Sequence, residues 1–236
     1  MSRLKGVLQD PLLSVVMPCF NESETIEEII RRVLAVPIRI QLIIVDDGSK
    51  DGTRDILARL QSELGFTLVL QPHNQGKGAA LRRGFEEVRG DIVVIQDADL
   101  EYSPEEFPSL IELIAQGRAD VVYGSRFLGR HRVFLFTHYL GNRLLTLVTN
   151  VLYNTMLTDM ETCYKVMRTE VLRSMSLHSD GFGIEPELTA KIFKRGYRVY
   201  ELPITYDGRG YDEGKKITWR DGFVALWVLV KYRFTE

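Results

Sequence analysis

LIIVDDGSKDGT, residues 42–53, is the stretch that decides the fold. Four apolar residues predict a buried strand, a polar turn with two glycines follows, and a helical pattern begins near Thr53. The same order of strand, polar turn and helix begins at residues 13–17. Further strands are predicted at 67–70, 92–95 and 121–123, with helices near 78–88 and 104–115. This alternation predicts an α/β fold with a mostly parallel central sheet and helices on both faces.

The composition is that of an ordinary globular protein. The 236 residues are 45% hydrophobic and 26% charged, which predicts a single domain over residues 1–236 with a real core. A net charge of −2 excludes a sequence-wide attraction to nucleic acid, and we expect no nucleic-acid partner. Two cysteines are too few for a disulfide framework or a cysteine zinc site, so we expect a cytoplasmic location.

The second half of the chain differs from the first. Residues 126–158 contain four arginines and two histidines but no acidic residue, and an apolar pattern runs over 140–157. Near the C-terminus, residues 219–234 predict an apolar helix with basic flanks. The longest apolar run is eight residues, whereas a membrane-spanning helix needs roughly 20, so we expect no transmembrane helix. Buried core helices and helices lying on a membrane surface both explain the pattern; the aromatic candidates for a membrane interface are Phe134, Phe136, Tyr139, Trp219, Trp227 and Tyr232.

Acidic residues follow several predicted strands, and ligands of open parallel sheets bind beyond the carboxyl ends of the strands. Asp97, Asp99 and Glu101 come directly after the strand at 92–95. Carboxylates at this spacing fit a hard cation, Mg²⁺ or Mn²⁺, that bridges the protein to substrate phosphates. Solvated loop acids that cap the next helix are the alternative explanation.

Two further polar turns are candidates for ligand contact. Asp46, Asp47 and Asp51 can accept hydrogen bonds from ribose hydroxyls or a base, or they serve only as turn and cap residues. In residues 74–78 (NQGKG), glycines would let the backbone approach a phosphate and Lys77 would add charge, or the segment is a plain turn.

Taken together, these motifs resemble those of the family-two inverting glycosyltransferases of the GT-A fold. Within that family the chain is most similar to the polyprenyl-phosphate sugar synthases, such as the dolichyl-phosphate mannose and glucose synthases. The resemblance covers nearly the whole chain, and it rests on residues 16–22 (VMPCFNE), 45–53, 74–78, 97–99, 124–126 (GSR), 158–165 (TDMETCYK), 183–187 (GIEPE) and 203–216.

The resemblance implies a division of labour along the chain. Residues 13–126 would form the nucleotide-sugar-binding half, and 127–236 the acceptor-binding half with C-terminal amphipathic helices at a membrane surface. The donor would be a UDP-hexose or GDP-mannose, and the metal Mg²⁺ or Mn²⁺. The nucleotide sugar would be held by Pro18, Asn21, Glu22, Asp46, Asp47, Lys77 and Asp97, and the metal by Asp97, Asp99 and Glu101, although many relatives carry Gln at the position of Glu101.

A polyprenyl phosphate acceptor is already ionised near neutral pH, so it needs cations to position it rather than a general base. Arg126, Arg209, Lys215 and Lys216 are the candidates for that role, unless they are ordinary surface charges. Asp159 would orient an arginine or act as a base, and Glu185 and Glu187 are catalytic candidates or helix-start carboxylates.

The expected enzyme is therefore a metal-dependent hexosyltransferase that is peripheral at the cytoplasmic face of a membrane. Two alternatives remain: a glycosyltransferase with a soluble or cell-envelope hydroxyl acceptor, with Asp159 or Glu187 as base, and a catalytically silent module that binds nucleotide sugars or lipids.

Overall fold

A computed structural model describes residues 6–132, 135–208 and 219–235, with the side chains of 219 and 220 excepted. Arg209, Lys215, Lys216, Phe134 and the Trp219 side chain, all singled out above, lie outside the described residues or side chains.

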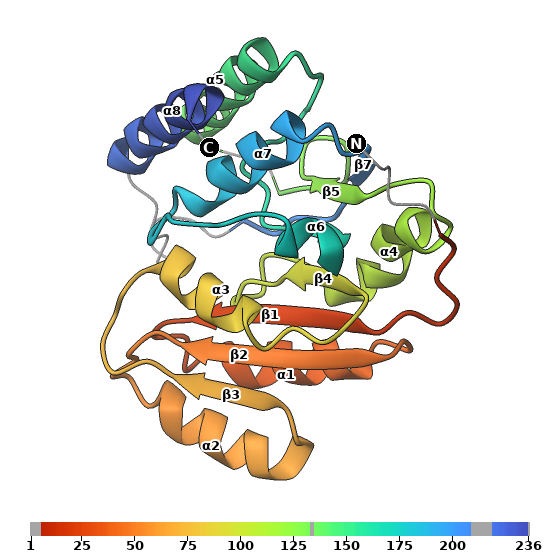
Figure 1. Cartoon of the computed structure of the whole chain (residues 1–236). Helices are drawn as coiled ribbons and strands as arrows, with labels where there is room; N and C mark the ends of the chain where they lie inside the picture. Colours follow the sequence, from red (N-terminus) through yellow and green to blue (C-terminus); the bar gives the residue numbers. More distant parts are fainter. Residues whose placement is uncertain (1–5, 133–134, 209–218, 236) are drawn as a thin grey trace.

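The centre of the described structure is a sheet of seven strands in the order β3-β2-β1-β4-β6-β5-β7 (Figure 1). Every strand pairs in parallel with its neighbour except β6, which runs antiparallel to both β4 and β5. The strands are β1 (Leu13–Cys19), β2 (Ile40–Asp46), β3 (Thr67–Leu70), β4 (Ile92–Ile95), β5 (Val121–Ser125), β6 (Lys165–Arg168) and β7 (Val199–Pro203).

Helices cover both faces of this sheet, which confirms the predicted α/β architecture. In Figure 1, α3 lies in front of β1, and α1 runs behind β2. The helical segments are α1 (Ile26–Ala35), α2 (Thr53–Leu64), α3 (Lys77–Phe85), the 3-10 turn η1 (Pro104–Glu106), α4 (Phe107–Ala115), α5 (Phe136–Tyr153), α6 (Thr169–Arg173), α7 (Ile184–Lys194) and α8 (Trp219–Phe234).

The central strands are almost completely buried, as their continuous apolar sequences predict. All seven residues of β1 are buried, and so are all four of β4. On α1, the residues at helical spacing that face the sheet are fully buried: Ile26, Ile29, Ile30 and Val33. This core fixes the carboxyl ends of β1, β2 and β4 next to one another.

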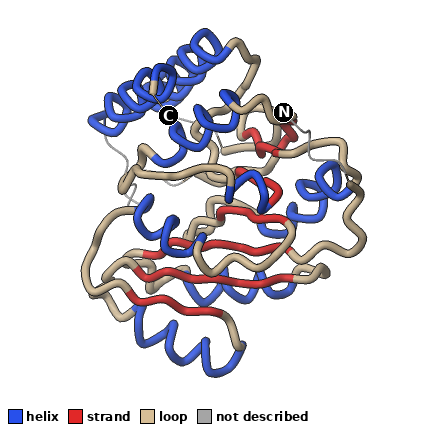
Figure 2. Tube along the Cα trace, in the orientation of Figure 1, coloured by secondary structure: helices blue, strands red, loops and turns tan. Residues whose placement is uncertain are grey.

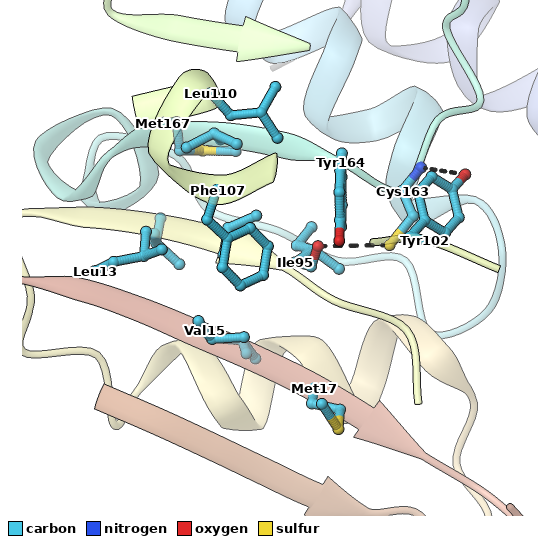
Figure 3. Close-up of a cluster of buried hydrophobic side chains, with 14 of the residues drawn as sticks. Leu13, Val15, Met17, Ile95, Tyr102, Phe107, Leu110, Cys163, Tyr164 and Met167 are labelled. Atoms are coloured by element: carbon cyan, nitrogen blue, oxygen red, sulfur yellow. Dashed lines mark hydrogen bonds between the residues drawn. The ribbon is translucent and has the colours of Figure 1, made fainter. Parts of the chain in front are cut away.

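An aromatic cluster holds the loop that leads into β6. The ring of Tyr164 packs 4.8 Å from that of Tyr102 and 5.6 Å from that of Phe107, measured between centroids (Figure 3). Tyr164 donates a hydrogen bond of 2.7 Å to the Gln96 side chain, and the Cys163 N–H donates one of 3.1 Å to the Tyr102 hydroxyl. Residues 163–164 are thereby tied to the segment that follows β4.

Helices α5 and α8 lie side by side beyond one end of the sheet, next to α7 (Figures 1 and 2). The Tyr153 hydroxyl of α5 donates a 2.7 Å hydrogen bond to the Leu229 carbonyl of α8. On the other side, Tyr232 of α8 is 2% exposed and its ring lies 4.2 Å from the Lys191 ammonium of α7. Tyr232 is thus a packing residue, and its expected place at a membrane interface is wrong.

Candidate functional site

A cavity of about 950 Å³ lies beyond the carboxyl ends of β1, β2 and β4. Its walls include residues from the polar turns, the N-terminus of α3, the loop before β6 and both α5 and α8. Most of the predicted site residues that the structure describes line it: Pro18, Glu22, Asp47, Lys77, Asp97, Asp99, Glu101 and Arg126. Asn21, Asp46, Asp159 and Glu187 are not among its lining residues.

The two aspartates after β2 have different surroundings. Asp46 is fully buried, and its Oδ2 accepts hydrogen bonds from the backbone N–H groups of Gly48 and Ser49 and pairs with Arg54 at 2.6 Å. Asp47 faces the cavity and accepts hydrogen bonds from the N–H groups of Gln75 and Gly76, at 2.7 and 2.8 Å. Burial raises the pKa of Asp47 although these two hydrogen bonds oppose the shift. Asp46 therefore shapes the turn, and Asp47 remains available to a ligand.

Asn21 connects the first two polar turns. Its backbone has a left-handed φ of 53°, its N–H donates to the Ser49 hydroxyl, and its side-chain oxygen accepts from the Lys50 N–H at 2.9 Å. These contacts position the turn after β1 against the turn after β2.

The glycines on either side of Lys77 lie close to the backbone of residues 179–180. A Cβ on Gly76 would collide with the carbonyl oxygen of Asp180, and one on Gly78 with that of Ser179. The Ala79 N–H also donates to the Asp180 carbonyl at 3.0 Å. These glycines thus allow the 179–180 backbone to pack on the start of α3, a contact that the sequence did not predict.

Lys77 connects two acidic residues that are far apart in the sequence. Its ammonium lies 2.8 Å from Asp97 Oδ1 and 2.8 Å from Glu185 Oε1. Burial opposes the charge on Lys77, but the two carboxylates outweigh it and raise the lysine pKa well above its ordinary value. Lys77 is a permanent cation that joins the end of β4 to the first turn of α7.

The predicted metal ligands lie on one wall of the cavity, but not as a three-carboxylate cage. Asp99 accepts a 3.1 Å hydrogen bond from the Glu101 N–H, and Glu101 Oε2 accepts one of 2.8 Å from the Tyr206 hydroxyl. Among the residues that the structure describes, no three acidic, cysteine or histidine side chains converge to hold a metal ion by themselves.

Arg126 and Asp159 form a buried, two-pronged ion pair at the end of β5. The guanidinium Nε and Nη2 donate to the two carboxylate oxygens at 2.7 and 2.8 Å, and the Arg126 N–H donates to Oδ2 at 3.0 Å. The guanidinium also lies over the Tyr206 ring, 5.3 Å from its centroid. Of the two roles considered for Asp159, orienting an arginine is the one that this geometry provides.

Glu187 belongs to a different network, on the far side of α7 from Glu185. It is fully buried, pairs with Lys191 at 2.5 Å, and accepts hydrogen bonds from the N–H groups of His178 and Ser179. Burial raises its pKa less than these partners lower it, so that the net shift is downward. The structure does not bring Glu187 to the cavity.

Glu161 is a cavity residue to which the sequence assigned no role, although it lies in the quoted segment 158–165. Burial, and then the charge of Glu185, raise the pKa of its carboxyl from 4.5 to about 7. Nothing in the local sequence distinguishes Glu161 from a surface acid, because the charges that act on it include those of Arg126 and Glu185, which lie far from it along the chain.

One end of the cavity is closed by α5 and α8, through Thr137, His138, Gly141, Asn142 and Leu145 of α5 and Asp221, Gly222 and Ala225 of α8. The outer surfaces of these two helices are apolar. Phe136 is 74% exposed, Trp227 is 67% exposed, and further exposed apolar residues are Leu140, Leu144, Leu147, Val151, Phe223, Val224 and Phe234. None of the described helices combines the length and the hydropathy that crossing a bilayer requires.

Comparison with known proteins identifies the family. The family model "Glycosyl transferase family 2" matches residues 14–175, which contain the polar turns, the Lys77 segment and the Arg126–Asp159 pair. The chain belongs to glycosyl transferase family 2.

Two curated relatives are similar to this family member. A dolichol-phosphate mannosyltransferase from Pyrococcus furiosus is 30% identical over 209 residues, which cover 86% of this chain and 58% of the relative. An undecaprenyl-phosphate 4-deoxy-4-formamido-L-arabinose transferase from Pseudomonas syringae pv. syringae is 40% identical over 111 residues, 44% of this chain and 33% of the relative. The chain therefore matches little more than half of the first relative and a third of the second.

The fold also matches that of a solved enzyme. Glucosyl-3-phosphoglycerate synthase from Mycobacterium tuberculosis, in complex with Mn²⁺, UDP and phosphoglyceric acid, superposes with a TM-score of 0.74 at 22% identity. The match covers 96% of this chain and 80% of that one. It confirms the expected GT-A fold.

Proposed function

We propose that this protein transfers a hexose from a UDP- or GDP-linked sugar to a polyprenyl phosphate at a membrane surface, with inversion at the anomeric carbon. The observation that carries the proposal is the composition of one cavity. Its walls contain the acidic turns of a donor site and a buried arginine suited to phosphate, and α5 and α8, which carry exposed apolar residues, close it. Both curated relatives are named as transferases that act on polyprenyl phosphates.

The charge of the cavity supports a divalent cation in the donor site. Its described lining contains eight carboxylates, namely Glu22, Asp47, Asp97, Asp99, Glu101, Glu161, Glu185 and Asp221, against only Lys77 and Arg126 as permanent cations. A nucleoside diphosphate would be repelled by this surplus without a further positive charge. Mg²⁺ commonly binds through one or two carboxylates together with substrate phosphates, so Asp97 and Asp99 suffice as protein ligands.

The donor would lie along the acidic turns, with the base and ribose near Asp47 and Glu22 and the diphosphate near Asp97, Asp99 and Lys77. A bound Mg²⁺ or Mn²⁺ would stabilise the charge that develops on the departing diphosphate. The Mycobacterium tuberculosis structures contain Mn²⁺ or Mg²⁺ together with UDP, which supports this assignment.

The acceptor phosphate would lie against Arg126. An oxygen of the phosphate attacks the anomeric carbon, the bond from that carbon to the diphosphate oxygen breaks, and the nucleoside diphosphate leaves with the electron pair. Because the phosphate is already ionised, the step does not require Asp159, whose two oxygens are engaged by Arg126, to take up a proton. We propose that Asp159 holds the guanidinium in place. Arg209, Lys215 and Lys216 remain candidates for the same phosphate.

The membrane contact would be made by α5 and α8. A helix that is apolar on nearly all sides is buried in a core or lies in a lipid interface, and much of the apolar surface of this pair is exposed. Basic residues lie on the same elements, with Arg143 on α5 and Lys231 and Arg233 in the last turn of α8. Their charge would favour an anionic, cytoplasmic leaflet.

The test supplies radiolabelled UDP-glucose or GDP-mannose with Mn²⁺ and undecaprenyl phosphate in vesicles. The proposal requires label in the organic phase. Label that appears only in a water-soluble product would favour a hydroxyl acceptor, and no transfer from any donor, with nucleotide sugar still bound, would favour a silent binding module. Either result would overturn the proposal.

A further inference from the structure

Two carboxylates in the cavity each have one buried oxygen atom without a partner among the described residues. Among the described residues, no hydrogen-bond donor reaches Glu161 Oε1 or Glu185 Oε2. Glu185 is 3% exposed, and both residues line the cavity. Buried side-chain oxygens in native proteins nearly always have a partner, so an unpartnered pair in a cavity calls for an explanation.

Other contacts fix the positions of Glu161 and Glu185, although one oxygen of each has no partner among the described residues. Glu185 Oε1 is fixed by Lys77 at 2.8 Å, which leaves Oε2 as the free acceptor. Glu161 lies in a loop whose carbonyl groups on either side, those of Met160 and Thr162, accept hydrogen bonds from the buried Lys165 ammonium at 2.8 and 2.6 Å. Both carboxyl groups line the same cavity, and the charge of Glu185 contributes to the raised pKa of Glu161.

We propose that Glu161 and Glu185 form the sugar subsite and accept hydrogen bonds from hydroxyl groups of the transferred hexose. The inference rests on the proposed function, because it assigns the residues that bind the sugar of the proposed nucleotide-sugar donor. Lys77 joins Glu185 to Asp97, where the diphosphate would end, and the sugar is bonded directly to that diphosphate.

The chemistry of the pair favours a neutral hydrogen-bond donor over other ligands. An anionic phosphate would meet two carboxyl groups, and a lipid chain would leave both oxygens unpaired in an apolar contact. A sugar hydroxyl donates one hydrogen bond and brings no charge.

The experiment compares affinity for the whole donor with affinity for the part without the sugar. Glu161→Gln and Glu185→Gln each keep the side-chain shape but present an NH₂ group in place of one carboxylate oxygen. Calorimetry with Mn²⁺ measures the Kd of UDP-glucose or GDP-mannose and that of free UDP or GDP. We expect the Kd of the nucleotide sugar to rise at least about tenfold, and that of the nucleoside diphosphate to change less than about twofold.

Glu187→Gln is the matched control. Glu187 is a buried carboxylate on the same helix, two residues from Glu185, but it bonds Lys191 and does not line the cavity. Its replacement should lower the Tm and leave the ratio of the two Kd values unchanged. Donors that lack one sugar hydroxyl sharpen the test. The wild type should bind such a donor more weakly than the full donor, whereas the variant without the acceptor for that hydroxyl should bind both with the same Kd.

Two results would overturn the sugar subsite. An equal loss of affinity for nucleotide sugar and nucleoside diphosphate would mean that the carboxylates act through Lys77 or the cation. Unchanged affinities with a collapse of kcat in Glu161→Gln would make Glu161 a proton acceptor instead. The Kd measurements need no acceptor, so the subsite can stand even if vesicle assays place the sugar on something other than a lipid. If the wild-type protein binds nucleoside diphosphates but no nucleotide sugar, both proposals fall.

Discussion

Strands β1 and β4 and the α5/α8 pair are all rich in apolar residues, yet they are buried to opposite degrees. All residues of β1 and β4 are buried. Of the 18 residues of α5, only Thr146 and Thr149 are buried, and Trp227 of α8 is 67% exposed. The strands have found their apolar partners within the domain, whereas the outer surface of the helix pair has none among the described residues.

This difference is what the two proposed roles of the cavity walls would require. The wall at the strand ends is held by a rigid core, which suits the positioning of charged groups for chemistry. The wall formed by α5 and α8 presents apolar surface outward, which suits contact with a lipid surface. Substitutions at the strand ends should therefore change the rate of sugar transfer, and substitutions on the outer surface of α5 and α8 should change binding to membranes.

The largest expected effect is at the Arg126–Asp159 pair. Arg126→Ala leaves the buried Asp159 charge without its partner, so we expect the free energy of unfolding to fall by about 3–5 kcal/mol in urea denaturation. Arg32→Ala is the control, because Arg32 makes the same kind of contact with Glu105 near the surface. It should cost less than about 1 kcal/mol. A similar loss in both variants would contradict the role of burial.

Asp99→Asn tests only the cavity wall at the strand ends. The amide keeps the oxygen that accepts from the Glu101 N–H, so folding should be retained, but one carboxylate ligand of the proposed cation is lost. We expect kcat to fall at least about 100-fold, which corresponds to roughly 3 kcal/mol of transition-state stabilisation. Vesicle binding should not change. Full turnover of the variant at ordinary Mg²⁺ would remove Asp99 from the metal site.

The double variant Phe223→Glu/Trp227→Glu tests the cavity wall formed by α5 and α8. Both side chains are mostly exposed on α8, so the Tm should change little, while sedimentation with anionic vesicles should weaken at least about tenfold through loss of apolar burial in the lipid. Leu70→Glu is the control, because Leu70 is 51% exposed at the end of β3. Equal vesicle binding by wild type and the double variant would exclude this surface as the membrane contact.

The smallest expected effect is a dependence of stability on pH at Glu161. Burial and the Glu185 charge raise its pKa from 4.5 to about 7. Between these values the folded protein keeps a proton that the unfolded chain has lost, so this contribution is full below pH 4.5 and is lost as the pH rises through 7. We expect the wild type to lose at least about 1 kcal/mol relative to Glu161→Gln across this range in denaturation at fixed temperature. Parallel pH profiles for the two proteins would show that Glu161 titrates normally.

Local patterns were sufficient for most of the secondary structure of residues 13–126. The strands β3 (Thr67–Leu70) and β4 (Ile92–Ile95) have the predicted bounds, since short apolar runs between polar turns have few other stable arrangements. The helix α8 (Trp219–Phe234) also has its predicted bounds. The same patterns did not reveal that Gly76 and Gly78 pack on residues 179–180, because that contact joins segments about a hundred residues apart.

The direction of β6 is a second feature that no local pattern contains. The chain leaves β5 at the edge where the cavity lies, forms α5 beyond that edge, and returns to the sheet from the same side. The strand β6 must then run back between β4 and β5, antiparallel to both.

The sequence by itself determined the alternation of strands and helices, the acidic turns at the strand ends and the family to which the motifs belong. Each of these depends on the spacing of residues that are close along the chain. Only the tertiary structure decided that Asp159 holds Arg126, that Glu187 does not line the cavity, and that Glu161 and Glu185 both line it. Burial and charge coupling are set by groups that meet in space from distant parts of the chain, and the same carboxylate serves as a solvated acid, an ion-pair partner or a ligand group according to those neighbours.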